Sequence, residues 1–519
     1  MRWFLIGLVM LIGMSMAPIG SVFAEEAAKE AKSVAESAPA GEAKSGDVDA
    51  GKKLYEKWCI NCHGESGGGD GPAADFLRPR PRNFTSGQFK IRSTMSGKLP
   101  TDDDLFHVIS KGMPGTSMPA WEERLKEPER RQIISYIKTF SRRFARAKEA
   151  PEQVKIGARV ASSAESIARG RELFRKVECF KCHGNGGRAD GPSAPDLTDD
   201  WNNPIRPANL TKPWNFRGGH QPEDLYRRLQ GGLAGTPMPS FSDSLNNEQM
   251  WDVINYVMSL WPDPTGNKPP LKVVLKARRV EGPIPTAPGD PFWQKQEVFR
   301  YPLVGQVIQD PRLFTPSVDE IQVQAVYNAD TLALRLVWDD PTHSVPDAAK
   351  GIFEDAVAVQ LPIEAPTGPK RPYFLMGDND LGVQLLQWSN TGGVSGTAAE
   401  LNGHGLAHVV TEPPSSQETR ATGEYADGEY QLVMTRPLKT ADPAHDIQLE
   451  AGKFNPIAFF VWDGSNGETG PKTAISHWYY FLLEPPLPTT VYIYPAIGVV
   501  VAAGLQWWLI RRLRQRGPS

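Results

Sequence analysis

The sequence Cys59-Ile60-Asn61-Cys62-His63 recurs as Cys179-Phe180-Lys181-Cys182-His183, at an offset of 120 residues. Two other segments repeat at this offset: Asp-Gly-Pro at 70–72 and 190–192, and Gly-Thr-X-Met-Pro at 115–119 and 235–239. Segments that repeat in one register predict tandem copies of one domain. We place the two copies at residues 46–148 and 166–264. Helical periodicity before each cysteine pair, and again at 129–140 and 247–260, predicts that both are all-α.

Each Cys-X-X-Cys-His motif is the signature of a covalently attached c-type haem. The two thiols form thioether bonds to the haem, and the adjacent histidine binds the iron. The motifs use all four cysteines of the chain: Cys59 and Cys62 with His63 for the first haem, and Cys179 and Cys182 with His183 for the second. A zinc site would require more paired Cys or His ligands, and a redox-active cysteine pair would not need a histidine directly after it.

A methionine lies 55 residues after each of these histidines, at Met118 and at Met238. Met113 is a nearby alternative, but the second copy has Leu233 at the corresponding position. The arrangement resembles the class I cytochromes c, in which a loop methionine is the second axial ligand. His/Met ligation raises the reduction potential and fills both axial positions, which favours electron transfer over chemistry at the iron.

The chain changes character after residue 262. Residues 262–291 are rich in proline, which predicts a linker. Polar and apolar residues then alternate, which predicts short strands at 321–327, 332–338, 356–361, 430–435, 457–462 and 477–483. We therefore expect an antiparallel, all-β sandwich over residues 271–486.

The two ends of the chain predict export and a membrane anchor. Residues 1–24 resemble a signal peptide, with an uncleaved anchor as the alternative, and residues 25–45 a flexible leader. Residues 490–510 are apolar and long enough to cross a membrane, although a buried soluble helix has a similar composition. The basic tail at 511–519 then lies in the cytoplasm and the bulk of the chain on the periplasmic side. A net charge of −3 argues against nucleic-acid binding.

Four segments of the β-region carry a further resemblance: PYFLMGD at 372–378, VQLLQW at 383–388, FVWDGSNGE at 460–468 and KTAISHW at 472–478. They resemble the haem b-binding γ subunits of molybdoenzymes such as ethylbenzene dehydrogenase, and the related nitrite oxidoreductase γ subunits. The resemblance implies one non-covalent haem b, held by Met376 and Lys472. Lys472 would have to be neutral to bind iron, which requires a desolvated site. The other candidate ligands in this region are Met434, Lys439, Lys453, His404, His408 and His477.

The combined pattern predicts a membrane-anchored electron-transfer subunit with two haems c and one haem b, and with no catalytic residue of its own. The resemblance implies an iron–sulfur subunit and a molybdenum catalytic subunit as partners, and a respiratory cytochrome as the further carrier. Among the relatives we favour nitrite oxidoreductase, because fused c-type haems suit delivery to a cytochrome. The alternatives are a dihaem oxidase or peroxidase, and a dihaem cytochrome whose β-domain binds carbohydrate through Trp388 and Trp462.

Overall fold

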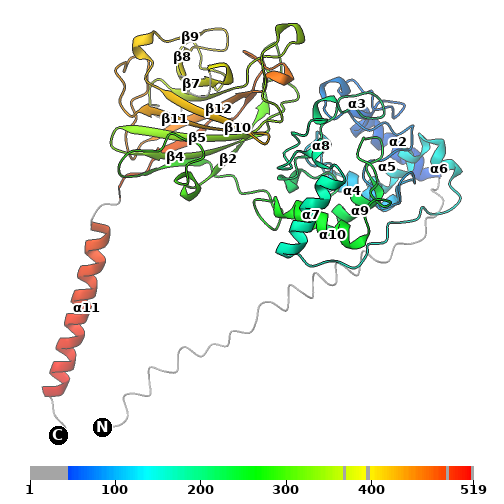
Figure 1. Cartoon of the computed structure of the whole chain (residues 1–519), viewed down its shortest axis with the longest axis horizontal. Helices are drawn as coiled ribbons and strands as arrows, with labels where there is room; N and C mark the ends of the chain where they lie inside the picture. Colours follow the sequence, from blue (N-terminus) through cyan, green and yellow to red (C-terminus); the bar gives the residue numbers. More distant parts are fainter. Residues whose placement is uncertain (1–44, 366–369, 393–397, 487–489, 516–519) are drawn as a thin grey trace. The chain divides into compact units, whose positions relative to one another are not determined.

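A computed structural model describes residues 45–365, 370–392, 398–486 and 490–515. The signal peptide expected at 1–24 lies outside the described residues, as does the expected leader except for its last residue. Residues 43–485 form one compact unit, and the C-terminal helix belongs to a second unit (Figure 1). The compact unit contains a helical part followed by a part made of strands, as the sequence predicts.

The helical part contains two similar sets of helices. The first set comprises α2 (Ser45–Trp58), α3 (Ile60–His63), α4 (Asp102–Lys111), α5 (Glu127–Thr139) and α6 (Arg142–Arg146), with a short 3-10 turn at Ala74–Phe76. The second set comprises α7 (Ala164–Lys176), α8 (Phe180–His183), α9 (Pro222–Gly231) and α10 (Asn247–Ser259), with 3-10 turns at Ala194–Asp196 and Pro213–Asn215. The helices expected before each cysteine pair and at the end of each copy are therefore present.

The first and last long helices of each copy pack closely across a glycine. A Cβ atom on Gly51 of α2 would lie 1.9 Å from the carbonyl oxygen of Gln132 in α5. A Cβ atom on Gly170 of α7 would lie 2.0 Å from the carbonyl oxygen of Asp252 in α10. Both distances are far below van der Waals contact, so only glycine permits these helix crossings.

The strands of the β-domain are β1 (Val274–Arg279), β2 (Phe299–Pro302), β3 (Val304–Gly305), β4 (Glu320–Tyr327), β5 (Thr331–Asp339), β6 (Ala356–Pro362), β7 (Val383–Ser389), β8 (Ala399–Gly403), β9 (Val409–Thr411), β10 (Arg420–Ala426), β11 (Glu429–Pro437), β12 (Phe454–Trp462), β13 (Ala474–Ile475) and β14 (Tyr479–Leu483). Their main order is β10-β11-β5-β4-β1-β14-β12-β6-β7-β8-β9, with β2, β3 and β13 attached to this path. All six predicted strands are present.

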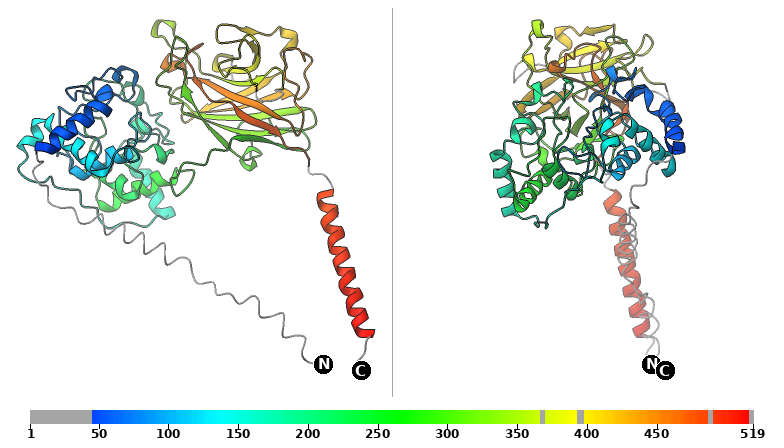
Figure 2. Two further views of the ribbon diagram at one scale, coloured as in Figure 1. Left: turned by 180° about the vertical axis from the view of Figure 1, so that it is seen from behind. Right: turned by 90° about the vertical axis from the view of Figure 1, so that its right-hand side faces the viewer.

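The two halves of this path fold against one core, as expected for a sandwich (Figure 2). Leu336 of β5 and Leu432 of β11 come from one half, and Val357 of β6 and Phe459 of β12 come from the other. All four side chains are wholly buried in the same cluster. Burial of such apolar surface is the main stabilising contribution to a fold of this kind.

Two expectations about the β-domain were wrong. The proline-dense stretch at 262–291 contains strand β1, because its central segment, Val-Leu-Lys-Ala-Arg-Arg, is free of proline. The sheet is also not wholly antiparallel: β1 pairs in parallel with β14 along Val274–Ala277 and with β4 at Arg278 and Arg279. Strand β1 therefore joins the half of the sheet that contains β4 to the half that contains β14. Its partners lie far away in the sequence, so local sequence patterns do not predict these pairings.

The C-terminal helix α11 spans Thr490–Gln515. Its segment Ile493–Leu513 has a mean hydropathy of 1.7 and is long and apolar enough to cross a membrane. The helix continues through Arg511 and Arg512, beyond the expected boundary at residue 510, because arginine is a good helix former.

Replacing Gly51 with alanine should destabilise the first cytochrome-like copy. The new Cβ must push α5 away from α2, and overpacking of this kind lowers the free energy of unfolding by about 1–3 kcal/mol. The matched control is Gly46→Ala in the same helix, where a Cβ meets no atom within 4 Å. Urea unfolding followed by circular dichroism should show a loss for Gly51→Ala only; equal stability of both variants would contradict the close crossing.

Candidate haem-binding sites

The first candidate site is a cavity of about 360 Å³ lined by Cys59, Cys62, His63 and Met118. The single turn of α3 places both thiols and the imidazole at one end of this cavity. Met118 reaches it from the loop after α4, in which the amide of Met113 donates a hydrogen bond of 3.0 Å to the Met118 carbonyl. The histidine and the methionine, 55 residues apart in sequence, therefore line one cavity.

The second candidate site repeats this geometry in a cavity of about 630 Å³ lined by Cys179, Cys182, His183 and Met238. The amide of Leu233 donates a hydrogen bond of 3.1 Å to the Met238 carbonyl, as Met113 does to Met118 in the first copy. No disulfide joins the four motif cysteines, so both pairs are available for thioether bonds.

Each motif histidine is oriented by a backbone carbonyl. The Nδ1 atom of His63 lies 3.1 Å from the carbonyl oxygen of Arg82, and Nδ1 of His183 lies 2.9 Å from that of Ala208. Donation from Nδ1 leaves Nε2 free to bind a metal. Burial lowers the pKa of His63 to about 4 and also lowers the pKa of His183. Both imidazoles are then neutral near pH 7, which is the form that binds iron.

The two cavities share part of their walls. Lys90 and Ile91 of the first copy and Ile205 and Arg217 of the second line both cavities. Trp201 of the second copy also lines the first cavity. The repeat pattern does not predict this shared wall, because the wall arises from contacts between residues far apart in the chain.

The shared wall contains two basic side chains, Lys90 and Arg217. Burial, reinforced by repulsion from Arg217, lowers the pKa of Lys90 to about 7, and burial lowers that of Arg217 to about 10. In addition, Nη1 of Arg82 is buried and has no hydrogen-bond partner in the described part of the chain. Haem carries two propionate carboxylates, and such groups pair well with buried guanidinium donors. These residues therefore fit a haem in each cavity.

The two residues expected to hold haem b lie in different surroundings. Met376 is buried beside Phe460 and Trp462, on the loop between β6 and β7, and its φ of 59° is unusual for a non-glycine residue. Lys472 precedes β13, and its Nζ donates a hydrogen bond of 3.0 Å to the carbonyl of Asn466. Among the described residues, Met376 and Lys472 share neither a hydrogen bond nor a core cluster. The ligation of haem b by this pair thus stays a prediction.

Three of the other candidate ligands, Met434, Lys439 and Lys453, are engaged elsewhere. Met434 is buried in the main core of the sandwich. Lys439 and Lys453 are exposed and both form ion pairs with Glu450. His404 is exposed, with Nδ1 3.3 Å from the carbonyl of Asp378.

A carbohydrate-binding platform at Trp388 and Trp462 is contradicted by the structure. Their exposed fractions are 3% and 5%. Such a platform requires exposed rings that can stack on a sugar, whereas these two indoles belong to the core.

Comparisons with known families divide the chain as its fold does. Residues 46–137 match the family described as "Cytochrome C oxidase, cbb3-type, subunit III", and residues 167–261 match "Cytochrome c". Residues 290–404 and 397–474 match "Ethylbenzene dehydrogenase".

Three similar proteins cover about two fifths of this chain each. A protein of Haloferax mediterranei named as a respiratory nitrate reductase heme subunit is 27% identical over 42% of this chain and 74% of its own. The chlorate reductase subunit gamma of Ideonella dechloratans is 25% identical over 41% of this chain and 86% of its own. A chain of the reducing HAO-like protein complex of Kuenenia stuttgartiensis is 43% identical over 41% of this chain and 96% of its own, with a TM-score of 0.39.

The helical domains and their Cys-X-X-Cys-His sites define a cytochrome c, with covalently bound haem. The match of the β-domain completes the identification. This chain is a cytochrome c fused to a γ-subunit domain of the ethylbenzene dehydrogenase type.

Replacing Met118 or Met238 with alanine should remove one axial ligand and lower the potential of that haem, because thioether ligation raises it. Potentiometric titration of each variant should show one haem shifted and the other near its original potential. Met113→Leu is the matched control, since Met113 lines the first cavity and the second copy has leucine at this position. A large shift in Met113→Leu, with none in Met118→Ala, would reverse the assignment.

Proposed function

We propose that this chain is a membrane-anchored electron-transfer subunit with two haems c and one haem b. It passes electrons between a molybdenum oxidoreductase and a respiratory cytochrome. The observation that carries the proposal is the wall shared by the two c-type cavities, because haems in two cavities with common lining residues would be neighbours.

The residues of each c-type site hold the haem and do not bind a substrate. His63 and Met118 would bind the first iron, and His183 and Met238 would bind the second. Arg82, and with it the two cations of the shared wall, Lys90 and Arg217, would neutralise the propionates. Bound haem supplies a one-electron couple, and the protein sets its potential through the axial ligands and the surrounding charge.

Haem b in the β-domain would be the third carrier. The proposal rests on the match of residues 290–474 to the ethylbenzene dehydrogenase family and on the buried position of Met376. The Lys472 amine would give up its hydrogen bond to the Asn466 carbonyl and bind the iron instead. Ile475, three residues after Lys472, belongs to the same buried cluster as Met376, which is consistent with this ligand pair.

The partners follow from the similar proteins. The names of the Haloferax and Ideonella proteins include nitrate reductase and chlorate reductase, so we infer that a molybdenum catalytic subunit and an iron–sulfur subunit assemble with this chain. We favour nitrite oxidoreductase as the complex. Helix α11 would anchor the subunit with its bulk on the periplasmic side, after export by the signal peptide.

Purification of the tagged full chain from native membranes tests this function. Molybdenum and the iron of iron–sulfur clusters should copurify with the chain. Nitrite should reduce the haems c if the complex oxidises nitrite. Chlorate and nitrate should instead oxidise the reduced protein if the complex works as a reductase. Absence of molybdenum, combined with hydrogen peroxide turnover by the isolated chain, would contradict the proposal and favour a dihaem peroxidase.

Met376→Ala and Lys472→Ala should each abolish haem b and retain both haems c, because each removes one axial ligand. A pyridine haemochrome assay measures both haem types in one sample. The wild type should contain two haems c for each haem b. The control Met434→Leu replaces the other methionine of this domain, which is buried in the core, and should retain haem b. Unchanged haem b in both test variants would exclude this ligand pair.

A further inference from the structure

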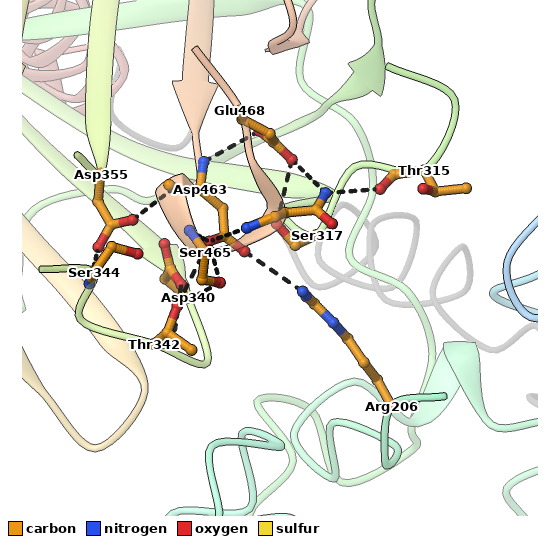
Figure 3. Close-up of polar contacts among 12 residues, drawn as sticks. Arg206, Thr315, Ser317, Asp340, Thr342, Ser344, Asp355, Asp463, Ser465 and Glu468 are labelled. Atoms are coloured by element: carbon orange, nitrogen blue, oxygen red, sulfur yellow. Dashed lines mark hydrogen bonds and ion pairs between the residues drawn. The ribbon is translucent and has the colours of Figure 1, made fainter. Parts of the chain in front are cut away.

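Three aspartates meet in the interior of the β-domain, where three strand ends converge (Figure 3). Asp340 follows β5, Asp355 precedes β6 and Asp463 follows β12. Each has an exposed fraction of 0%. One carboxylate oxygen from each residue lies within 4.8 Å of those of the other two.

In two of these carboxylates, only one of the two oxygens accepts hydrogen bonds from the described residues. Oδ1 of Asp340 accepts hydrogen bonds from the amide and the hydroxyl of Thr342, at 3.0 and 3.2 Å. Oδ1 of Asp463 accepts from the amide and the hydroxyl of Ser465, at 2.9 and 2.6 Å. Among the described residues, neither Oδ2 atom accepts a hydrogen bond, although both are buried. Buried oxygens without a partner are rare in native proteins.

The charge of the cluster is poorly balanced by the chain. The nearest cationic group is Arg206, whose Nη2 lies 3.6 Å from Oδ2 of Asp463 and whose side chain is 45% exposed. Burial, together with repulsion from Asp463 and Asp355, raises the pKa of Asp340 well above its ordinary value. Buried carboxylates are normally paired with a cation or coordinate a metal.

A second acidic cluster in the same domain shows the contrast. Glu400, Glu412 and Asp446 also have carboxylate oxygens within 4.8 Å of one another. The cation beside them is Arg436, which is 2% exposed. Burial lowers the pKa of Arg436, and the negative charges of the three carboxylates partly offset this effect. Gln384 connects the groups, because it accepts from Arg436 and donates to Glu400 and Asp446. The cation of this second cluster, Arg436, is buried within it, whereas Arg206, the cation beside the aspartate cluster, is 45% exposed.

We propose that Asp340, Asp355 and Asp463 bind a calcium ion. The carboxylates supply hard oxygen donors, and the hydroxyls of Thr342 and Ser465 add oxygen atoms beside them. Calcium binds six to eight oxygen ligands in flexible geometry, whereas magnesium requires a nearly ideal octahedron and transition metals favour nitrogen or sulfur. A divalent cation together with Arg206 would neutralise the three carboxylates.

Calcium at this position would connect the proposed redox centres. Arg206 also lines the second haem cavity, so the ion would lie beside the contact between that cavity and the β-domain. Asp463 begins the loop that leads to Lys472, and the Glu468 carboxylate within this loop accepts a hydrogen bond from the Asp463 amide at 3.1 Å. The ion would therefore hold the loop that presents the proposed haem b ligand.

Metal analysis and thermal unfolding of the haem-loaded full chain test this site. After removal of loose ions, the wild type should retain one calcium per chain. Chelation should lower its Tm by several degrees, and added calcium should restore it, because a ligand that binds the folded state stabilises it. The Asp340→Asn variant should lose both the ion and the calcium response.

Two further variants separate binding from general structural damage. Glu412→Gln changes the second acidic cluster and should keep one calcium and a normal calcium response. Arg206→Gln removes a positive charge beside the ion and should tighten calcium binding several-fold in isothermal titration calorimetry. A wild type without calcium, or a calcium response that persists in Asp340→Asn, would overturn the proposal; so would an unchanged calcium affinity in Arg206→Gln.

Discussion

The short turns that end at His63 and His183 constrain the rest of each cytochrome domain. A thioether-linked haem would fix the two thiols and the imidazole relative to one macrocycle, and the loop methionine lines the same cavity. The carbonyl oxygens of Arg82 and Ala208 lie within hydrogen-bond distance of the two Nδ1 atoms and orient both histidine rings. In each copy the methionine loop and the basic side chains of the shared wall line the same cavity as the histidine.

The two cytochrome domains pack against each other at the wall that their cavities share. Ile91 and Ile205 contribute apolar surface to both cavities, and Lys90 and Arg217 contribute charge to both. The buried side chain of Arg92 also donates to the carbonyl of Gly231, which links the first copy to the second. Such contacts would hold two bound haems near one another, as the proposed electron relay requires.

Much of this organisation could be predicted from the sequence, because it depends on local or repeated signals. The Cys-X-X-Cys-His motifs, the two Met-Pro loops and the alternation in β4 and β5 all have fixed spacing. The parallel strand β1 and the shared wall could not be predicted, since both arise from contacts between residues far apart in the chain. The aspartate cluster of Asp340, Asp355 and Asp463 was missed for the same reason. No two of these residues belong to one recognisable motif.

Flash photoreduction of the oxidised full chain tests the central claim of a built-in relay most directly. In a Met238→His variant, bis-histidine ligation lowers the potential of the second haem and distinguishes it from the first. We expect electrons placed on the second haem to reach the first in a first-order process whose rate is independent of protein concentration. A rate that increases in proportion to protein concentration would mean that electrons pass between molecules, and would contradict the account.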